Sequence, residues 1–199
     1  MIPKYSGSLT GEPIMLYETR IVANKLLQDK TEQQIRNEIL DSNEFGYKTK
    51  KSIPKRVNSI LRRLKNLDKG FLKIINDDLS GDGKVVVIYA ISLENRLFSE
   101  LIAENVSYKL LTKDVNYSKK DIIKFINTKA EMNDKIASYK EYTIYRMAVS
   151  IFNILKEAGI IEKSGGTSYL VPINVSYKLR EMFQNINKLT FLENLGGRI

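Results

Sequence analysis

One stretch decides how the N-terminal part of the chain folds: Ser52-Ile53-Pro54-Lys55-Arg56-Val57-Asn58-Ser59-Ile60-Leu61-Arg62-Arg63-Leu64-Lys65-Asn66. Its apolar residues recur at the spacing of an α-helix and share one narrow face. That face consists of Ile53, Val57, Ile60, Leu61 and Leu64. Pro54 stands in the first turn, where a helix tolerates proline. The stretch therefore predicts an amphipathic helix whose apolar face packs into a core.

The remaining faces of this helix are polar and basic. Lys55, Asn58, Ser59, Arg62 and Asn66 lie opposite the apolar face, and Arg56 and Arg63 flank them. From Phe45 to Leu67 there are eight basic residues and no acid, whereas ordinary surface helices mix charges of both signs. Short polar residues allow close approach to a groove, and long basic ones reach phosphates or base edges.

This pattern predicts a nucleic-acid-binding surface made of Lys48, Lys50, Lys51, Lys55, Arg56, Asn58, Ser59, Arg62 and Arg63. The lysines before the helix lie where its N-terminal dipole also favours phosphate. The alternative is a solvated basic face on a structural helix. Phe45 and Tyr47 could stack on bases, but aromatic residues beside a turn more often close a core, and we favour that interpretation.

Two helices are predicted before the basic helix, over residues 13–28 and 31–41. Thr31 and Gln34 have the spacing of a capping box, which marks the start of the second helix. The segment from Ser42 to Tyr47 predicts a turn or loop. The second helix, this connection and the basic helix together resemble a helix-turn-helix, although the connection is longer than the usual tight turn.

The rest of the chain is predicted to be mostly helical. Helices are expected over 68–75, 97–111, 118–134 and 140–158, and over 85–93, where the β-branched run is also compatible with a strand. The turn-rich segment Asn76–Lys84 is the best candidate boundary, which divides the chain into residues 1–76 and 77–199. The predicted fold is mainly α, a multi-helical bundle with an N-terminal helix-turn-helix-like segment and a small C-terminal β-hairpin.

The hairpin is expected at about residues 160–172, where two short apolar strands flank glycines. A helix followed by a short glycine-tipped hairpin is the outline of a winged-helix wing. Lys163, Ser164 and Thr167 at its tip are candidates for a second contact with nucleic acid. A structural hairpin or a protein contact explains the same residues at least as well.

Composition limits the function classes. The formal charge is +9, from 32 Lys and Arg against 23 Asp and Glu, and the basic excess lies mainly in the first third. The absence of His and Cys excludes Cys/His zinc sites, cysteine nucleophiles and Ser-His-Asp triads. The segment from Ser80 to Lys84 fails the phosphate-loop pattern, because Asp78 and Val85 occupy the positions of its required Gly and Ser/Thr.

These observations predict no catalytic residues, no metal and no cofactor, so we expect a protein that is not an enzyme. The remaining enzymatic alternative is a metal-dependent nuclease built on Asp82 and Lys84. The chain has no apolar run long enough to span a membrane, and its first residues do not form a signal peptide. We therefore expect a cytoplasmic protein without membrane contact.

Landmarks scattered along most of the chain resemble one known family. They are Tyr5-Ser6-x-Ser8-Leu9-Thr10-x-Glu12-Pro13, Glu18, Arg20, Asn43-x-Phe45-x-Tyr47-x-Thr49-x-x-Ser52, Arg56, Tyr89-Ala90 and Asn95-Arg96-Leu97. This set is similar to the BrxA family of bacteriophage exclusion (BREX) systems. The resemblance implies a small, mainly helical, non-enzymatic DNA-binding protein, similar in its helical packing to the antitermination factor NusB. It also implies other BREX components as partners, a methyltransferase and an ATPase among them.

The resulting hypothesis is an accessory protein of phage defence that binds double-stranded DNA mainly through phosphates. One alternative is an adaptor that docks other defence proteins. Another is an RNA binder in the manner of NusB. The sequence leaves open the oligomeric state, any DNA sequence preference and the step of defence that the protein serves.

Overall fold

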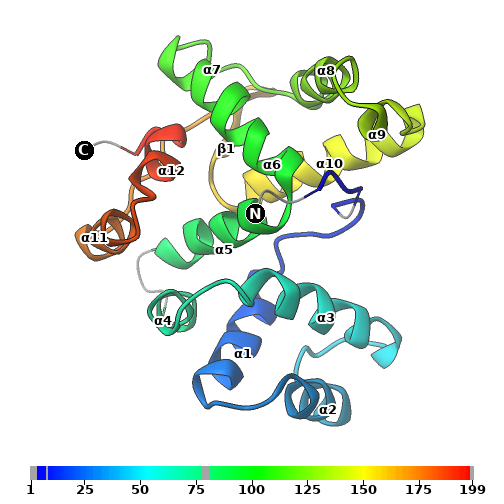
Figure 1. Ribbon diagram of the computed structural model, residues 1–199, viewed down its shortest axis with the longest axis vertical. Helices are drawn as coiled ribbons and strands as arrows, with labels where there is room; N and C mark the ends of the chain where they lie inside the picture. Colours follow the sequence, from blue (N-terminus) through cyan, green and yellow to red (C-terminus); the bar gives the residue numbers. More distant parts are fainter. Residues whose placement is uncertain (1–3, 8, 78–80, 198–199) are drawn as a thin grey trace. The chain divides into compact units, whose positions relative to one another are not determined.

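The computed structural model describes residues 4–7, 9–77 and 81–197, and it is mainly helical with a small two-stranded antiparallel sheet (Figure 1). The predicted fold class is confirmed. Ser8 of the opening motif and residues 78–80 of the predicted turn lie outside the described residues. The chain forms two compact units, Met15–Ala90 and Met1–Ile14 with Ile91–Ile199. We call them the 15–90 unit and the 91–199 unit.

The 15–90 unit contains the predicted N-terminal helices. They are α1 (Leu16–Leu27), α2 (Glu32–Ser42), the 3-10 turn η1 (Lys50–Ser52), α3 (Ile53–Leu64) and α4 (Lys69–Asp77). Thr31 and Gln34 form the predicted capping box at the start of α2. Asp68 caps α4, because its Oδ1 accepts a hydrogen bond from the Phe71 amide at 3.1 Å. The helix α1 packs against both α3 and α4, and α3 also packs against α2.

The division between the units differs from the predicted one at residues 76 and 77. The helix α5 (Asp82–Glu94) follows α4, and the unit boundary falls inside it at Ala90. The Tyr89 ring contacts the Phe71 ring of α4 at 5.9 Å between centroids, so the first part of α5 packs with the N-terminal helices. The apolar run Val85–Ile91 is therefore a buried helix, and the strand alternative is wrong.

The 91–199 unit continues with helices α6 (Arg96–Glu100) and α7 (Ser107–Leu111), joined by the π-helical segment η2 (Leu101–Val106). These three elements account for the helix predicted over 97–111. Next come α8 (Lys119–Ala130), α9 (Asp134–Ala137) and α10 (Glu141–Glu157). The last helices are α11 (Tyr177–Asn185) and α12 (Leu189–Asn194). Among the described residues, no helix is both long and apolar enough to cross a membrane.

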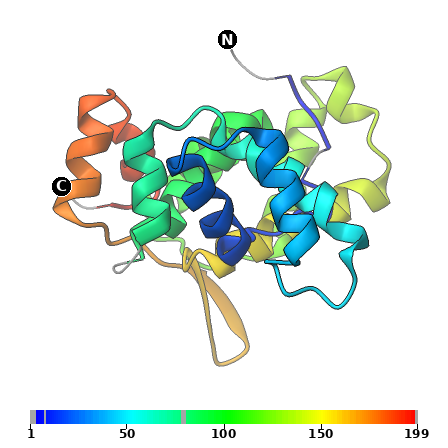
Figure 2. The ribbon, with the colours of Figure 1, turned by 90° about the horizontal axis from the view of Figure 1, so that it is seen from below.

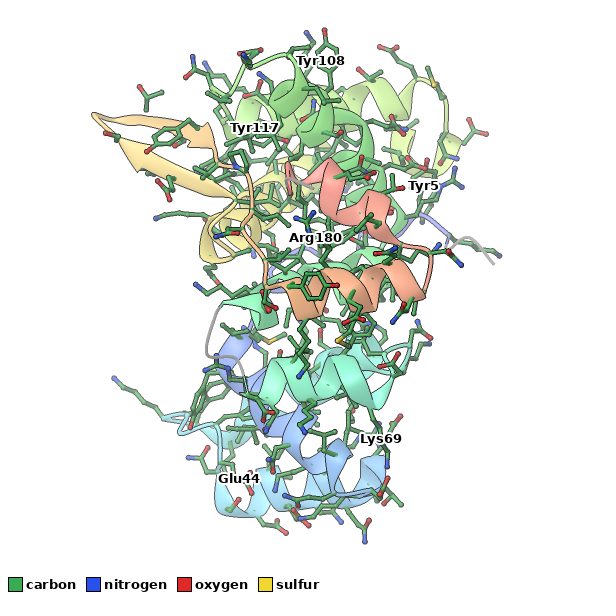
Figure 3. The ribbon with its side chains drawn as sticks, turned by 90° about the vertical axis from the view of Figure 1, so that its left-hand side faces the viewer. Tyr5, Glu44, Lys69, Tyr108, Tyr117 and Arg180 are labelled. Atoms are coloured by element: carbon green, nitrogen blue, oxygen red, sulfur yellow. The ribbon has the colours of Figure 1, made fainter. Side chains whose placement is uncertain are left out.

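The predicted hairpin follows α10 directly and extends away from it (Figure 2). Its strands are β1 (Ile161–Ser164) and β2 (Thr167–Leu170), with Ser164 opposite Thr167. Gly165 and Gly166 form the two-residue turn, and both have positive φ (55° and 82°), as a type I′ turn requires. Strand β2 is fastened to the segment before α8, because the Tyr117 amide donates to the Ser168 carbonyl at 2.9 Å. Figure 3 shows Tyr117 beside the hairpin.

The N-terminal segment is held on α6 by polar contacts. The Tyr5 hydroxyl donates to the Glu100 carboxylate (2.7 and 2.9 Å), and the Arg96 guanidinium lies 4.2 Å from the Tyr5 ring centre (Figure 3). Burial raises the pKa of Glu100, but hydrogen bonds from Arg96, Tyr5 and Lys129 outweigh burial and keep that pKa below its usual value. These contacts give Tyr5 and Arg96 of the sequence landmarks a structural role.

Candidate nucleic-acid interface

The helix α3 buries the face that its sequence pattern predicts. All five apolar residues of that face lie in the core, namely Ile53, Val57, Ile60, Leu61 and Leu64. The helix begins at Ile53 with Pro54 in its first turn, directly after the 3-10 turn η1. The opposite face is therefore held outward by the packing of α3 against α1 and α2.

The buried arc of α3 is wider than the sequence predicts, and two site residues fall inside it. Ser59 is 3% exposed and Arg63 is 1% exposed, so the expectation that both lie on or beside the outer face is wrong. The physical reason is that α3 has neighbours on two sides, α1 and α2, rather than one. Burial on α3 therefore extends beyond the apolar stripe. Neither side chain can reach a ligand on the outer surface without rearrangement.

The outward residues form a cationic surface. Lys48, Lys50, Lys51 and Lys55 are exposed, and so is Lys65, which the predicted site omitted. Within the described part of the chain, no carboxylate lies within 4.0 Å of Lys48, Lys51, Lys55 or Lys65. The Lys50 ammonium donates to the Asp41 carbonyl at 2.8 Å, which leaves its charge uncompensated. We call these five residues the lysine surface.

Asn58 is exposed as predicted, but a side chain from α2 holds it. The Arg36 Nε donates to Asn58 Oδ1 at 2.7 Å, and Arg36 also pairs with Glu32 one turn earlier on α2. A shallow depression lies between these helices and is also lined by Arg62 and Lys65. Sequence reasoning missed Arg36, because only tertiary packing places α2 beside the outer face of α3.

The turn before α3 is fixed by Asn43. This residue ends α2 in the left-handed conformation (φ 52°), donates from Nδ2 to the Tyr47 carbonyl (2.9 Å), and accepts from the Tyr47 amide (3.2 Å). Phe45 is 4% exposed and lies in the core, which confirms the core interpretation for this ring. Its ring centre is 5.5 Å from that of Tyr47.

Tyr47 links the turn to α1. Its hydroxyl donates to Glu18 Oε1 at 2.5 Å, and burial together with Glu18 raises the pKa of Tyr47 to about 12. Tyr47 and Arg56 line a second shallow depression with Lys48, Thr49 and Ser52. Arg56 is half-buried, and its Nη1 lies 3.5 Å from the Met15 sulfur. The start of the lysine surface is thus positioned by four of the sequence landmarks, namely Glu18, Asn43, Tyr47 and Arg56.

Replacing Tyr47 by phenylalanine is expected to lower the free energy of unfolding by about 1 kcal/mol at neutral pH, because a half-buried hydrogen bond to a carboxylate is lost. The pKa of Tyr47 is raised by folding, so the bond contributes below pH about 10 and is lost as pH rises towards 12. The difference between wild type and Tyr47→Phe in denaturant melts should therefore shrink over that range. A difference that is constant up to pH about 12 would contradict this role for the hydroxyl.

Two other cations of the 15–90 unit, Lys25 and Lys30, are neutralised and do not belong to the lysine surface. Lys25 is buried and pairs with Glu38 and Glu44, both at 2.7 Å, and Lys30 also pairs with Glu38 at 2.6 Å. Burial lowers the pKa of Lys25, but the two carboxylates outweigh it and raise that pKa above its ordinary value. These pairs join α1 to α2 and to the turn at Glu44, which Figure 3 labels. Their role is structural.

The predicted second contact belongs to the 91–199 unit. Lys163, Ser164 and Thr167 are all exposed on the hairpin. The Lys163 ammonium lies 5.9 Å from the centre of the Phe152 ring of α10, at the outer limit of a cation–π contact. Asp82 of the nuclease alternative is 4% exposed at the start of α5.

Comparison with known proteins places the chain in a family. The sequence profile of the BrxA family matches residues 3–187. A protein described as "BREX protein BrxA" from Bacillus cereus (strain H3081.97) is 26% identical over 162 residues, which cover 81% of each chain. A second, described in the same words and from Escherichia coli O9:H4 (strain HS), is 25% identical over 162 residues, 78% of this chain and 73% of that protein.

A solved structure shares the fold. It is described as the crystal structure of an uncharacterized protein from Magnetospirillum magneticum, with a TM-score of 0.81 and 18% sequence identity. The match covers 97% of this chain and 98% of the other. The profile match over nearly the whole length supports the resemblance seen in the sequence landmarks, and the chain belongs to the BrxA family of BREX proteins.

Proposed function

We propose that the protein is a non-enzymatic DNA-binding accessory of a BREX phage-defence system, and that its lysine surface binds duplex DNA. The observation that carries this proposal is the group of exposed lysines without carboxylate partners on and around α3. Holding several like charges together costs electrostatic energy, which a polyanion relieves. Other BREX components are the proposed protein partners.

Phosphates are the proposed contact atoms, because the surface is rich in cations and poor in groups that read bases. Asn58 is exposed, but its oxygen already accepts from Arg36, which restricts the orientation in which its amide can meet a base edge. Ser59, predicted to face the groove, is buried. Binding should therefore depend little on DNA sequence.

Binding of duplex DNA is expected to weaken steeply with salt. If the lysine surface contacts four to five phosphates, the logarithm of the binding constant falls with a slope of about −4 against the logarithm of salt concentration. Affinity should then drop roughly 100- to 500-fold between about 50 and 200 mM salt. Fluorescence anisotropy with a labelled duplex measures this directly. An affinity that is flat across this range would overturn the proposal.

Two competitions extend the same assay. Unlabelled duplexes of unrelated sequence should compete equally, since phosphates carry the contact. Duplex RNA that competes better than duplex DNA would favour the RNA-binding alternative.

Incubation of plasmid with the protein and Mg²⁺ should leave the plasmid intact, and cleavage that Asp82→Asn abolishes would contradict a non-enzymatic role.

The adaptor alternative is favoured by a different observation. Leu111 is 79% exposed at the end of α7, and Tyr108 is exposed one turn before it. Exposed apolar side chains that lie together are typical of protein contacts. Binding of another BREX component that survives nuclease treatment and is lost on Leu111→Asp would support this second function.

A further inference from the structure

A groove in the 91–199 unit follows the exposed side of α10. Tyr145, Arg146, Val149 and Asn153 line it from the helix, and Pro13 and Lys119 line it from elsewhere. Lys119 is the first residue of α8, which packs against α10 (Figure 1). The groove has a volume of about 390 Å³, near the lower end of the range for small-ligand sites. This size suits a single nucleotide better than a duplex.

The groove has a defined shape because the N-terminal segment is fastened along α10. The Ser150 hydroxyl donates to the Glu12 carbonyl at 3.2 Å, and both groups are buried. Gly11 passes close to Arg146, and a Cβ built at Gly11 would lie 3.5 Å from Nη2 of that arginine. Gly11 also has φ +77°, a conformation that other residues rarely adopt. The Arg146 guanidinium therefore lies against the backbone that forms the opposite wall.

Two tyrosines on the same face of α10 are exposed, although burial of aromatic rings stabilises folded proteins. Tyr142 is 68% exposed and Tyr145 is 50% exposed. The Arg146 Nη1 donates to the Tyr142 hydroxyl at 3.2 Å, and its guanidinium lies 5.9 Å from the centre of that ring. Exposed rings beside cations are typical of proteins that stack the bases of unpaired nucleic acid.

Different residues of the groove are suited to contact the base and the phosphate of a nucleotide. Tyr145 offers a stacking surface, and Pro13 and Val149 offer apolar contact to a base. Arg146 supplies positive charge for a phosphate, and Lys119 adds a second cation to the lining. Asn153, two turns beyond Arg146, carries an amide that can pair with a base edge. Glu157 lies at the far end, about 16 Å along the axis from Arg146, and so does not oppose a phosphate held there.

We propose that this groove binds an unpaired nucleotide, with Tyr145 stacked on the base and Arg146 at the phosphate. The site is separate from the lysine surface, and its ligand differs from a duplex because a stacked pair of bases cannot present its faces to Tyr145. A free nucleoside monophosphate has the same chemistry as one nucleotide of a single strand. Competition by the free monophosphate distinguishes these two sources.

The test measures binding of the full chain to a labelled thymidine oligonucleotide of about 12 residues and to a labelled duplex. Tyr145→Ala should weaken binding of the oligonucleotide roughly 5- to 100-fold, as the loss of one base stack does, and leave duplex binding within about twofold. Tyr145→Phe should restore binding of the oligonucleotide, because the ring is retained. Arg146→Ala should weaken it as well.

The matched control is Tyr177→Ala on α11, since Tyr177 is 80% exposed and does not line the groove. Equal weakening by Tyr145→Ala and Tyr177→Ala, or failure of the wild type to bind the oligonucleotide, would overturn the proposal. Competition by thymidine monophosphate that Tyr145→Ala abolishes would support the groove and identify the free nucleotide as a ligand. Binding of the oligonucleotide without such competition would support it with a strand as the ligand.

The test of the groove with the oligonucleotide is independent of the test of duplex binding. A protein whose duplex affinity lacks salt dependence, but whose oligonucleotide affinity depends on Tyr145, would contradict the proposed function and support this site. The reverse result would support the proposed function and contradict this site.

Discussion

Replacing Lys51 and Lys55 together by glutamate is expected to weaken duplex binding by about 100-fold or more at physiological salt. Both ammonium groups are exposed and have no carboxylate partner within the described residues. The change removes two phosphate contacts and adds two repulsive charges at the centre of the lysine surface. The salt slope of the remaining binding should also become shallower, by about 2.

This pair is a better choice than one that includes Arg62, which the sequence places on the same outer face. Arg62 is half-buried and interacts with other groups of the protein, so its replacement would mix folding with binding. Lys51 and Lys55 are exposed, so the melting temperature of the variant should stay within a few degrees of the wild type. A circular dichroism melt checks this.

A control with the same change of net charge is Lys178→Glu with Lys188→Glu in the 91–199 unit. Both lysines are exposed and lie outside the lysine surface. If the two double variants weaken duplex binding equally, the total charge of the protein attracts DNA and α3 has no special role. If duplex binding is weakened only by Lys51→Glu with Lys55→Glu, the lysine surface is where the protein contacts DNA.

Replacing Phe45 by alanine is expected to destabilise the 15–90 unit by about 3–5 kcal/mol, the usual cost of removing a buried phenylalanine. The ring is 4% exposed, contacts Tyr47, and anchors the turn that leads into α3. Because the free energy of unfolding of native proteins is only about 5–15 kcal/mol, this single change removes a large part of the stability. Denaturant unfolding followed by circular dichroism measures the loss.

Phe45→Leu keeps an apolar side chain in the same cavity, and it should cost distinctly less than alanine. Under conditions where both variants remain folded, neither should change duplex affinity more than a few-fold. A stable Phe45→Ala variant that has lost binding would contradict the core role and would show that the ring stacks on a ligand.

Much of the candidate site could be predicted from the sequence, because amphipathic periodicity is a local property. The five apolar positions of α3 are buried as their spacing predicts, and Lys51, Lys55 and Asn58 are exposed as predicted. The capping box at Thr31 is also correct, since it involves residues only three positions apart. The hairpin follows from two glycines between short apolar strands.

The remaining features depend on which elements meet. The helical wheel treats α3 as having one buried side, so it could not show that Ser59 and Arg63 are buried. Nor could it show that Arg36 of α2 binds Asn58. The groove along α10 combines residues from the N-terminal segment, α8 and α10, and no short motif in the sequence marks that combination.

The sequence by itself determined the approximate positions of α1 to α5, α8 and α10, the apolar face of α3 and the absence of acids between Phe45 and Leu67. These depend on residues close together in the chain, whose spacing sets both helix formation and local charge. Only the tertiary structure decided which cationic side chains remain exposed to solvent and unpaired with carboxylates. Lys25 is neutralised by Glu38 and Glu44, Arg63 is buried, and the lysine surface remains exposed. The physical reason is that burial and ion pairing depend on the neighbours that folding brings together, and these come from distant parts of the chain.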